Sequence, residues 1–164
     1  MMSEKSASIR IYVDADACPV KDEVYRVAGR HALPVTVVAQ GFIRVPDDPL
    51  IERVAAGQAP DAADDWIMQR TDGHSIVVTS DIPLAARAVK AGAVAIAPDG
   101  RVFTEEAIGM ALAMRNLMTD LRSAGGETSG PRPFSKRDRS EFLSALDTAI
   151  RRLLRASVVV QKSP

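Results

Sequence analysis

Acidic side chains follow two apolar runs that lie far apart in the chain. Asp14 and Asp16 come directly after the run at 9–13, and Asp81 comes two residues after the run at 75–79. Two carboxylates about 4 Å apart repel each other by about 4 kcal/mol at an effective dielectric constant of 20. A group of such acids needs raised pKa values, a basic partner from elsewhere in the chain, or a divalent cation. Hard cations such as Mg²⁺ prefer oxygen ligands and commonly bridge carboxylates to a phosphate, so these residue types favour a metal-bound phosphate site.

The simplest alternative gives these acids local structural roles. An aspartate after a strand is commonly a helix cap or a turn residue. Asp61, Asp64 and Asp65 form a further acidic group, and their spacings of three and four place them on one face of a helical turn. That pattern is equally typical of a solvated helix start. The combined placement of the three acids after the apolar runs is what favours a functional site over separate caps.

Basic residues gather at the start of the last predicted helix. Ser135 and Asp138 are spaced as in a capping box. Arg137 and Arg139 occupy the first turn, where the helix dipole disfavours cations. Free N–H groups combined with guanidinium groups suit a bound phosphate. The alternative interpretation is a surface cluster of ion pairs that involves Asp138 and Glu141.

The elements that must position these residues follow from the hydrophobic pattern. Four apolar runs rich in β-branched residues predict strands at 9–13, 35–39, 75–79 and 93–97. Capping and proline signals predict helices from Pro19 to about 31, from Pro49 with Asp48 as its cap, from 82 to about 92, from Thr104 to about 121, and over 136–155. In the helix that begins near Thr104, we expect the apolar face, including Met110, Met114, Leu117 and Met118, to pack in the core.

Strands that alternate with helices predict a parallel sheet with right-handed crossovers. Ligands of such sheets bind outside the carboxyl ends of the strands, where the strand order reverses. If the runs at 9–13 and 75–79 are neighbours, the acids that follow them converge in one crevice. Thr79 and Ser80 leave the sheet at the same end and are expected to contact the ligand.

Length and composition limit the class of protein. A chain of 164 residues with 46% hydrophobic and 26% charged residues fits one globular domain. The 21 basic and 21 acidic residues cancel, so net charge gives no argument for nucleic acid or for a membrane surface. The lone Cys18 excludes an internal disulfide, and we expect it to be a small packed residue. The polar start and the lack of an apolar run of about 18 residues predict a cytoplasmic protein without a membrane span.

Four motifs together carry a resemblance to a known family. The stretches VDADACPV, TSDIPLA, GPRPF and RDR resemble the YaiI/YqxD family of uncharacterised bacterial proteins, which is grouped with PIN-like nucleases. The resemblance covers about residues 9–153. It implies a PIN-like α/β three-layer sandwich with a central, mainly parallel sheet of four or five strands. The whole chain, 1–164, would be one domain with a βαβ core over 8–122, a Gly/Pro loop over 123–135 and a C-terminal helix over 136–155.

The resemblance also implies a site that holds Mg²⁺ or Mn²⁺. By position, Asp14 and Asp81 would be metal ligands, Asp64 or Asp65 would be the intermediate acid, and Asp16 belongs to the family's own motif. The sequence therefore predicts a metal-dependent ribonuclease or phosphodiesterase that acts on RNA or nucleotides. In it Asp14, Asp16 and Asp81 are catalytic, and Thr79, Ser80, Arg137 and Arg139 bind the substrate.

Two other functions fit the same residues. One is a non-catalytic module that binds RNA or a nucleotide. The other is a haloacid-dehalogenase-type phosphatase, in which Asp14 is the covalent nucleophile, Asp16 the general acid/base and Thr79 or Ser80 the second-motif hydroxyl. The early helix signal at Pro19 and the presence of only Asp99 after the fourth apolar run oppose the phosphatase.

Overall fold

The computed structural model describes residues 9–16, 18–123 and 133–162. Most of the predicted Gly/Pro loop, residues 124–132, lies outside these ranges. The regular elements, in chain order, are β1 (Arg10–Asp14), α2 (Lys21–Arg30), β2 (Val35–Ala39), β3 (Ile51–Ala55), α3 (Ala62–Arg70), β4 (Ser75–Val78), α4 (Ile82–Lys90), β5 (Val94–Ile96), α5 (Glu105–Ser123) and α6 (Lys136–Lys162).

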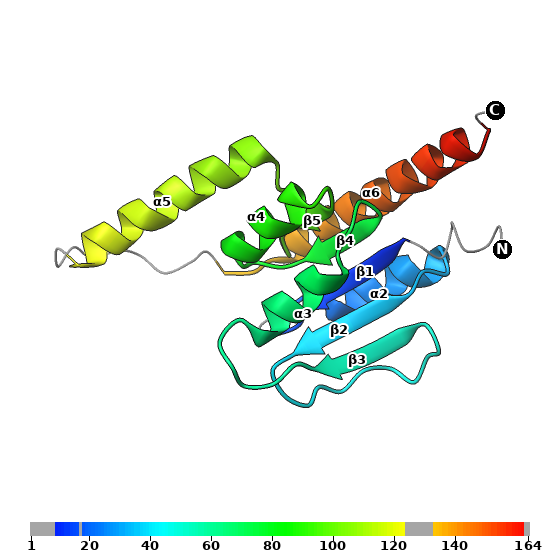
Figure 1. Cartoon of the computed structure of the whole chain (residues 1–164), viewed down its shortest axis with the longest axis horizontal. Helices are drawn as coiled ribbons and strands as arrows, with labels where there is room; N and C mark the ends of the chain where they lie inside the picture. The colour runs from blue at the N-terminus through cyan, green and yellow to red at the C-terminus, as the bar shows by residue number, and fades with distance from the viewer. Residues whose placement is uncertain (1–8, 17, 124–132, 163–164) are drawn as a thin grey trace.

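Five strands form one sheet in the order β3-β2-β1-β4-β5 (Figure 1). All four neighbouring pairs are parallel, which confirms the predicted α/β fold and its central sheet. The predicted neighbours β1 and β4 do pair, with Val13 level with Val78. The chain runs outward from β1 to β3 and then crosses back to β4. The strand order therefore reverses between β1 and β4, where open sheets of this kind bind ligands.

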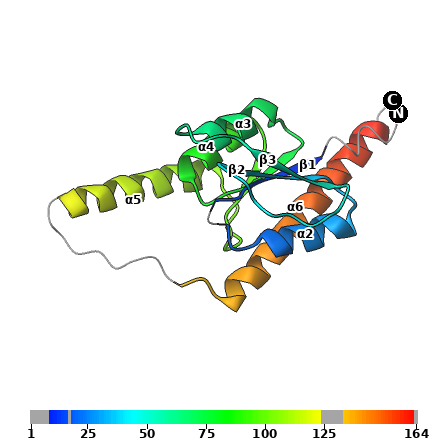
Figure 2. The same cartoon turned by 90° about the horizontal axis from the view of Figure 1, so that it is seen from below.

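Helices cover both faces of the sheet and make three layers. Figure 2 shows α2 and α6 on one face, with α3 and α4 on the other. Fully buried Phe142 and Leu146 of α6 pack against β1, and fully buried Leu84 of α4 packs against the opposite face beside Val77. Because both faces are covered, the strands read as continuous apolar runs rather than as alternating ones.

The segment around Pro49 is an edge strand, so the prediction of a helix there was wrong. The Asp48 side chain does cap a turn, since Leu50 N–H donates to its Oδ1 at 2.8 Å. The chain then leaves that turn as β3, which pairs with β2 from Ile51 to Ala55. Only one side of an edge strand is paired, and three of the five β3 residues are exposed. Polar residues at such positions weaken the apolar pattern that marks the buried strands.

Two helix boundaries also differ from the prediction. Pro19 lies in the turn before α2 and is not its first residue, because the first helical bond runs from Val24 N–H to the Val20 carbonyl at 3.0 Å. At the other end of the chain, α6 continues to Lys162 instead of ending at 155. Residues 156–162 contain neither glycine nor proline, the usual stop signals of a helix.

Helix α5 begins where it was predicted to begin, but its apolar face is not in the core. The Thr104 hydroxyl caps it by accepting from Ala107 N–H at 3.0 Å. Ile108 packs against α4 and the sheet, whereas Met110 is 70% exposed and Met114 and Leu117 are more than half exposed. Figures 1 and 2 show the reason: beyond its first turns α5 extends away from the sheet. The predicted core position was therefore wrong for Met110, Met114 and Leu117, and Met118 is only half-buried.

Among the described residues, no helix combines the length and the apolar character that crossing a bilayer requires.

Candidate functional site at the carboxyl ends of β1 and β4

Asp14 and Thr79 join the ends of the two strands at the point of strand reversal. Asp14 is the last residue of β1 and is half-buried, and Thr79 follows β4 and is buried. The Thr79 hydroxyl donates to Asp14 Oδ2 at 2.7 Å. The same hydroxyl accepts from Asp81 N–H at 2.9 Å. Thr79 therefore fixes the Asp14 carboxylate and the start of α4 relative to each other.

Asp81 is the N-cap of α4, as the simpler interpretation of the sequence proposed. Its Oδ1 accepts from Leu84 N–H at 3.4 Å, and Pro83 occupies the first turn, where a missing N–H costs nothing. The cap does not consume the whole group, because a carboxylate has about four acceptor positions. Asp81 therefore caps the helix and still has carboxylate acceptor positions left, and its charge acts on Asp14.

Asp64, from the first turn of α3, is the third acid of the group. Burial raises its pKa to about 7, and the charges of Asp81 and Asp14, a hydrogen bond with the Asp81 side chain and the charge of Asp61 add to the effect. A hydrogen bond between two carboxyl groups requires one proton. With a pKa of about 7, Asp64 is partly protonated near neutral pH.

Asp14 experiences the same surroundings more weakly. Burial raises its pKa, the hydrogen bond from Thr79 lowers it, and the charges of Asp81 and Asp16 raise it again. The charged groups that shift Asp14 and Asp64 are all acids. Repulsion among such acids can be relieved by raised pKa values, by a basic partner or by a divalent cation. Here the pKa values of Asp14 and Asp64 are raised. We refer below to Asp14, Asp64 and Asp81 as the acidic triad.

The donor set of the triad fits a hard divalent cation. Carboxylate oxygens with a neighbouring hydroxyl are the ligand types of Mg²⁺ and Mn²⁺, and their surplus negative charge favours a cation. Within the described residues, however, no group of three or more His, Cys, Asp or Glu side chains is arranged to hold a metal ion as it stands. A cation held there would require these side chains to rearrange.

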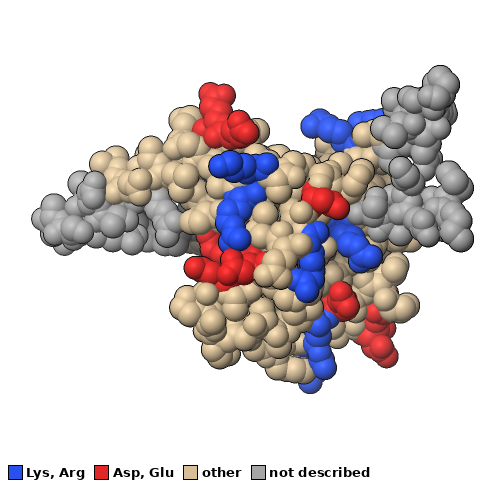
Figure 3. All heavy atoms as spheres, in the orientation of Figure 1, with Lys and Arg blue, Asp and Glu red and all other residues tan. Residues whose placement is uncertain are grey.

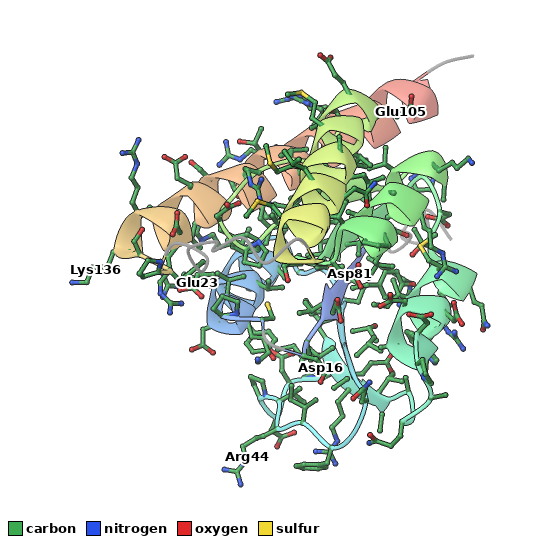
Figure 4. All side chains as sticks on the ribbon, turned by 90° about the vertical axis from the view of Figure 1, so that its left-hand side faces the viewer. Asp16, Glu23, Arg44, Asp81, Glu105 and Lys136 are labelled. Atoms are coloured by element: carbon green, nitrogen blue, oxygen red, sulfur yellow. The ribbon has the colours of Figure 1, made fainter. Side chains whose placement is uncertain are left out.

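The other predicted acids lie beside the triad or turn away from it. Asp16 is exposed, and its Oδ2 accepts from Gln40 N–H at 3.1 Å. Figure 4 views this edge of the sheet and shows Asp16 and Asp81 near the middle of the view. Asp65 instead pairs with Arg87 at 3.0 Å on the exposed side of α3 and α4. Of the two candidates for the intermediate acid, Asp64 is therefore the one on which Asp14 and Asp81 act, whereas Asp65 is paired with Arg87.

Arg139 is engaged within the fold, apart from the triad. Its guanidinium donates to the Pro19 carbonyl at 2.7 Å and lies 3.4 Å from Glu23 of α2. Arg139 also stacks over Phe134, with 4.9 Å from its guanidinium carbon to the ring centroid. These contacts tie the start of α6 to α2. A role for Arg139 in phosphate binding stays a prediction, and these contacts give it a structural role as well.

Arg137 lies on the same turn and is strongly exposed. It forms a long ion pair with Glu141 at 3.7 Å, and Ser135 and Asp138 close the predicted capping box, with Ser135 N–H donating to Asp138 at 2.9 Å. Arg137 does not appear among the groups that shift the pKa of Asp14 or Asp64. Its role in binding a phosphate also stays a prediction. Ser80, the remaining predicted contact, is exposed at the mouth of the site.

Cys18 and the net charge agree with the sequence-based expectations. Cys18 is buried, and burial raises the pKa of its thiol, as expected of a packed residue. On the face in Figure 3, acidic and basic side chains form small separate groups rather than one extended patch of a single sign. That face therefore shows no extended region of one charge, in keeping with the formal net charge of zero.

The segment that follows β2 contacts the site region, although no local sequence pattern marks it. Gln40 contacts Asp16, and beyond it Phe42 is strongly exposed at the same edge of the sheet. The available signal was topological: in a parallel sheet the carboxyl end of the strand next to β1 must also open onto the crevice.

The chain is similar to proteins for which no activity is stated. A family model described as "Uncharacterized BCR, YaiI/YqxD family" matches residues 12–152. A UPF0178 protein of Rhodopseudomonas palustris (strain TIE-1) is 73% identical over 149 residues, which cover 91% of this chain and 94% of the relative. A UPF0178 protein of Nitrobacter winogradskyi is 67% identical over 154 residues, which cover 94% of this chain and 98% of the relative.

Proposed function

Because the chain belongs to the YaiI/YqxD family, whose description gives no activity, we propose a function from its own geometry: a Mg²⁺- or Mn²⁺-dependent ribonuclease or phosphodiesterase acting on RNA or nucleotides. One observation carries the proposal. Asp14 of β1, Asp64 of α3 and Asp81 at the N-cap of α4 lie where the strand order reverses, and the charged groups that act on Asp14 and Asp64 are all acidic. An arrangement that costs the fold stability without an external cation is explained if a cation is part of its function.

The chain's own residues have distinct tasks in this proposal. A divalent ion supplies charge stabilisation for the phosphodiester and lowers the pKa of water. Asp14 and Asp81 would hold the ion, and the Thr79 hydroxyl keeps Asp14 in place through its 2.7 Å bond. Asp64 would lose its proton and become a further ligand of the ion. Asp16, whose side chain accepts a hydrogen bond from Gln40 N–H, would lie on the side of the site nearest β2.

The resemblance of the sequence motifs to a family grouped with PIN-like nucleases supports the proposal. The resemblance implies acids at strand ends that hold Mg²⁺ or Mn²⁺, and the triad lies at such ends. Asp64 then takes the place of the intermediate acid.

The test is hydrolysis of a single-stranded oligoribonucleotide and of bis(p-nitrophenyl) phosphate with Mn²⁺. Asp81→Asn is the informative variant, because asparagine caps a helix as well as aspartate does and should leave α4 intact. Losing only an outer partner of a metal site costs about 10–100-fold, so losing a ligand should reduce the rate at least about 100-fold. Asp65→Asn is the matched control, since it removes one carboxylate from the same region outside the triad and should keep the wild-type rate.

Other outcomes would reject the proposal in distinguishable ways. Equal rates for wild type and Asp81→Asn would assign the hydrolysis to another site or to a contaminant. Binding of RNA with Mn²⁺ present but without cleavage would support the non-catalytic module. Hydrolysis of a phosphomonoester alone, with beryllofluoride trapped on Asp14, would support the phosphatase.

A further inference from the structure

A solvent-exposed aromatic ring lies at the same edge of the sheet as the acidic triad. Phe42 is 75% exposed, the largest exposed fraction among the exposed large hydrophobic residues described. The guanidinium carbon of Arg53, on β3, lies 4.4 Å from the centroid of its ring. A shallow pocket of about 170 Å³ beside the ring is lined by Gly41, Phe42, Ile43, Arg53, Val54 and Ala55.

The backbone connects this ring directly to the candidate active site. Asp14 is level with Val38 of β2, and Ala15 N–H donates to the Val38 carbonyl at 2.8 Å. Two residues further on, Gln40 N–H donates to Asp16. Phe42 follows after one glycine and contacts Arg53 of β3, which is paired with Val37 and so projects toward the α2 face of the sheet. Asp14 is paired with Val38 and projects toward the α3 face, so the ring and the triad share the carboxyl-terminal edge of the sheet but lie toward opposite faces of it.

Two arginines give this surface a positive charge that the triad lacks. Arg44 and Arg53 are exposed, and neither forms an ion pair within the described part of the chain. Figure 4 shows Arg44 pointing outward at the margin of this edge. Unpaired guanidinium groups beside an exposed ring attract the phosphates of a strand whose base reaches that ring.

We propose that Phe42 and Arg53 form a stacking subsite for a base of single-stranded nucleic acid. Arg53 covers one face of the ring, and the large exposure of Phe42 leaves room for a flat aromatic group on the other. A base is such a group, and base–aromatic stacking with an adjacent guanidinium is a common way to hold single strands. The Arg53 guanidinium attracts the other face of the ring through a cation–π interaction and so helps to hold the ring in place. What happens to the bound strand rests on the proposed function, but stacking on Phe42 does not.

The experiment measures binding without cleavage. Fluorescence anisotropy of a labelled oligouridylate is recorded in EDTA at low salt, for wild type, Phe42→Ala and Phe134→Ala. Loss of one stacked base should weaken binding at least about fivefold in Phe42→Ala. Phe134→Ala is the matched control, because Phe134 is also exposed and also lies beneath a guanidinium, on α6, and its loss should leave affinity unchanged.

A strand with the same phosphates but abasic sugars separates stacking from charge. It should bind wild type and Phe42→Ala equally. In Phe42→Trp, addition of the oligouridylate should quench the new indole fluorescence, measured against wild type to subtract Trp66. The proposal is overturned if wild type does not bind the strand, if Phe42→Ala binds it as well as wild type does, or if the abasic strand shows the same loss.

The outcomes also distinguish this subsite from the proposed function. A strand that stacks on Phe42 but is never cleaved with Mn²⁺ would reject the hydrolase and keep the subsite. Cleavage that depends on Asp81 but not on Phe42, with equal binding by Phe42→Ala, would do the reverse. Concentration-dependent dimerisation abolished by Phe42→Ala would show that the ring contacts a second copy of the chain instead.

Discussion

Two regions of this molecule bring together charged residues that are distant in sequence, and they treat those charges in opposite ways. Where α2 meets α6, Arg139 pairs with Glu23 at 3.4 Å, and His31 lies 2.8 Å from Asp147. Each acid there has a basic partner from the same chain. In the acidic triad, the charged groups that act on Asp14 and Asp64 are other acids. The first region uses charge to join two helices, and the second holds charge that the fold leaves uncompensated.

The pKa shifts in the two regions have opposite signs. The hydrogen bond from His31 lowers the pKa of Asp147, whereas burial and neighbouring acids raise that of Asp64 to about 7. An acid whose pKa falls on folding stabilises the fold once it is ionised, and one whose pKa rises destabilises it. The comparison therefore separates a region whose charges stabilise the fold from the acidic triad, where the raised pKa values of Asp14 and Asp64 mean that ionisation destabilises it.

Breaking the α2–α6 region should have the largest effect on stability. Arg139→Ala leaves the nearly buried Glu23 carboxylate and the Pro19 carbonyl without this donor. We expect a loss of about 1–3 kcal/mol in the free energy of unfolding, measured by urea denaturation. Mn²⁺ affinity should be unchanged. A loss below about 0.5 kcal/mol, as for an exposed surface pair, would contradict the structural role of Arg139.

Neutralising one acid of the triad should stabilise the protein, whereas Arg139→Ala should destabilise it. The pKa of Asp64 rises from 3.8 unfolded to about 7 folded, so its destabilising effect accumulates between about pH 4 and pH 7 and is constant above. Asp64→Asn should therefore raise the melting temperature of the metal-free protein above pH 7 and leave it unchanged near pH 4. Thermal unfolding followed by circular dichroism across this range provides the check. An unchanged or lower melting temperature at every pH would count against the repulsion.

The same pH series should give the reverse result for Asp147→Asn. The pKa of Asp147 is lowered in the fold, so its contribution is present above the unfolded value of 3.8 and is lost as pH falls through the folded value. We expect the variant to lose about 0.2–1 kcal/mol near neutral pH and nothing in strong acid. Equal losses at both extremes would indicate that Asp147 acts through packing rather than charge.

The smallest effect should come from the pair that borders the triad without joining it. Arg87 and Asp65 are each about half exposed, and exposed pairs contribute little. Arg87→Ala should change the free energy of unfolding by less than about 0.5 kcal/mol. It should also leave Mn²⁺ affinity unchanged in a calorimetric titration. A clear change in affinity would mean that Asp65, once released from Arg87, turns into the site.

Much of the fold follows from the sequence because β-branched runs and helix caps are local signals. The runs of β1, β2, β4 and β5 and the cap at Thr104 were found in this way. The strand β3 was missed because its edge position allows polar residues such as Glu52 and Arg53, which hide the apolar run. The exposed face of α5 was misassigned because periodicity defines an apolar face without showing what covers it.

The site was predictable only as far as sheet geometry alone places residues. Asp14 and Asp81 follow neighbouring parallel strands, so their proximity is a consequence of topology. The sequence did not show which of Asp64 and Asp65 faces the site, because consecutive residues of a helix point about 100° apart and the rotation of the helix was unknown. Burial of Ala63 and Ile67 sets the roll of α3 and turns Asp64 inward. The hydrogen-bonding partners of Arg139, Pro19 and Glu23, lie more than a hundred residues away in the chain, and no local pattern reveals them.

The most direct test of the central claim is calorimetric titration of Mn²⁺ into wild type, Asp14→Asn, Asp81→Asn and Asp147→Asn near pH 8. If the triad is a cation site, each triad variant should bind at least tenfold more weakly, a loss of about 1.4 kcal/mol or more. Asp147→Asn should bind as wild type does. Wild-type affinity in both Asp14→Asn and Asp81→Asn would contradict the account.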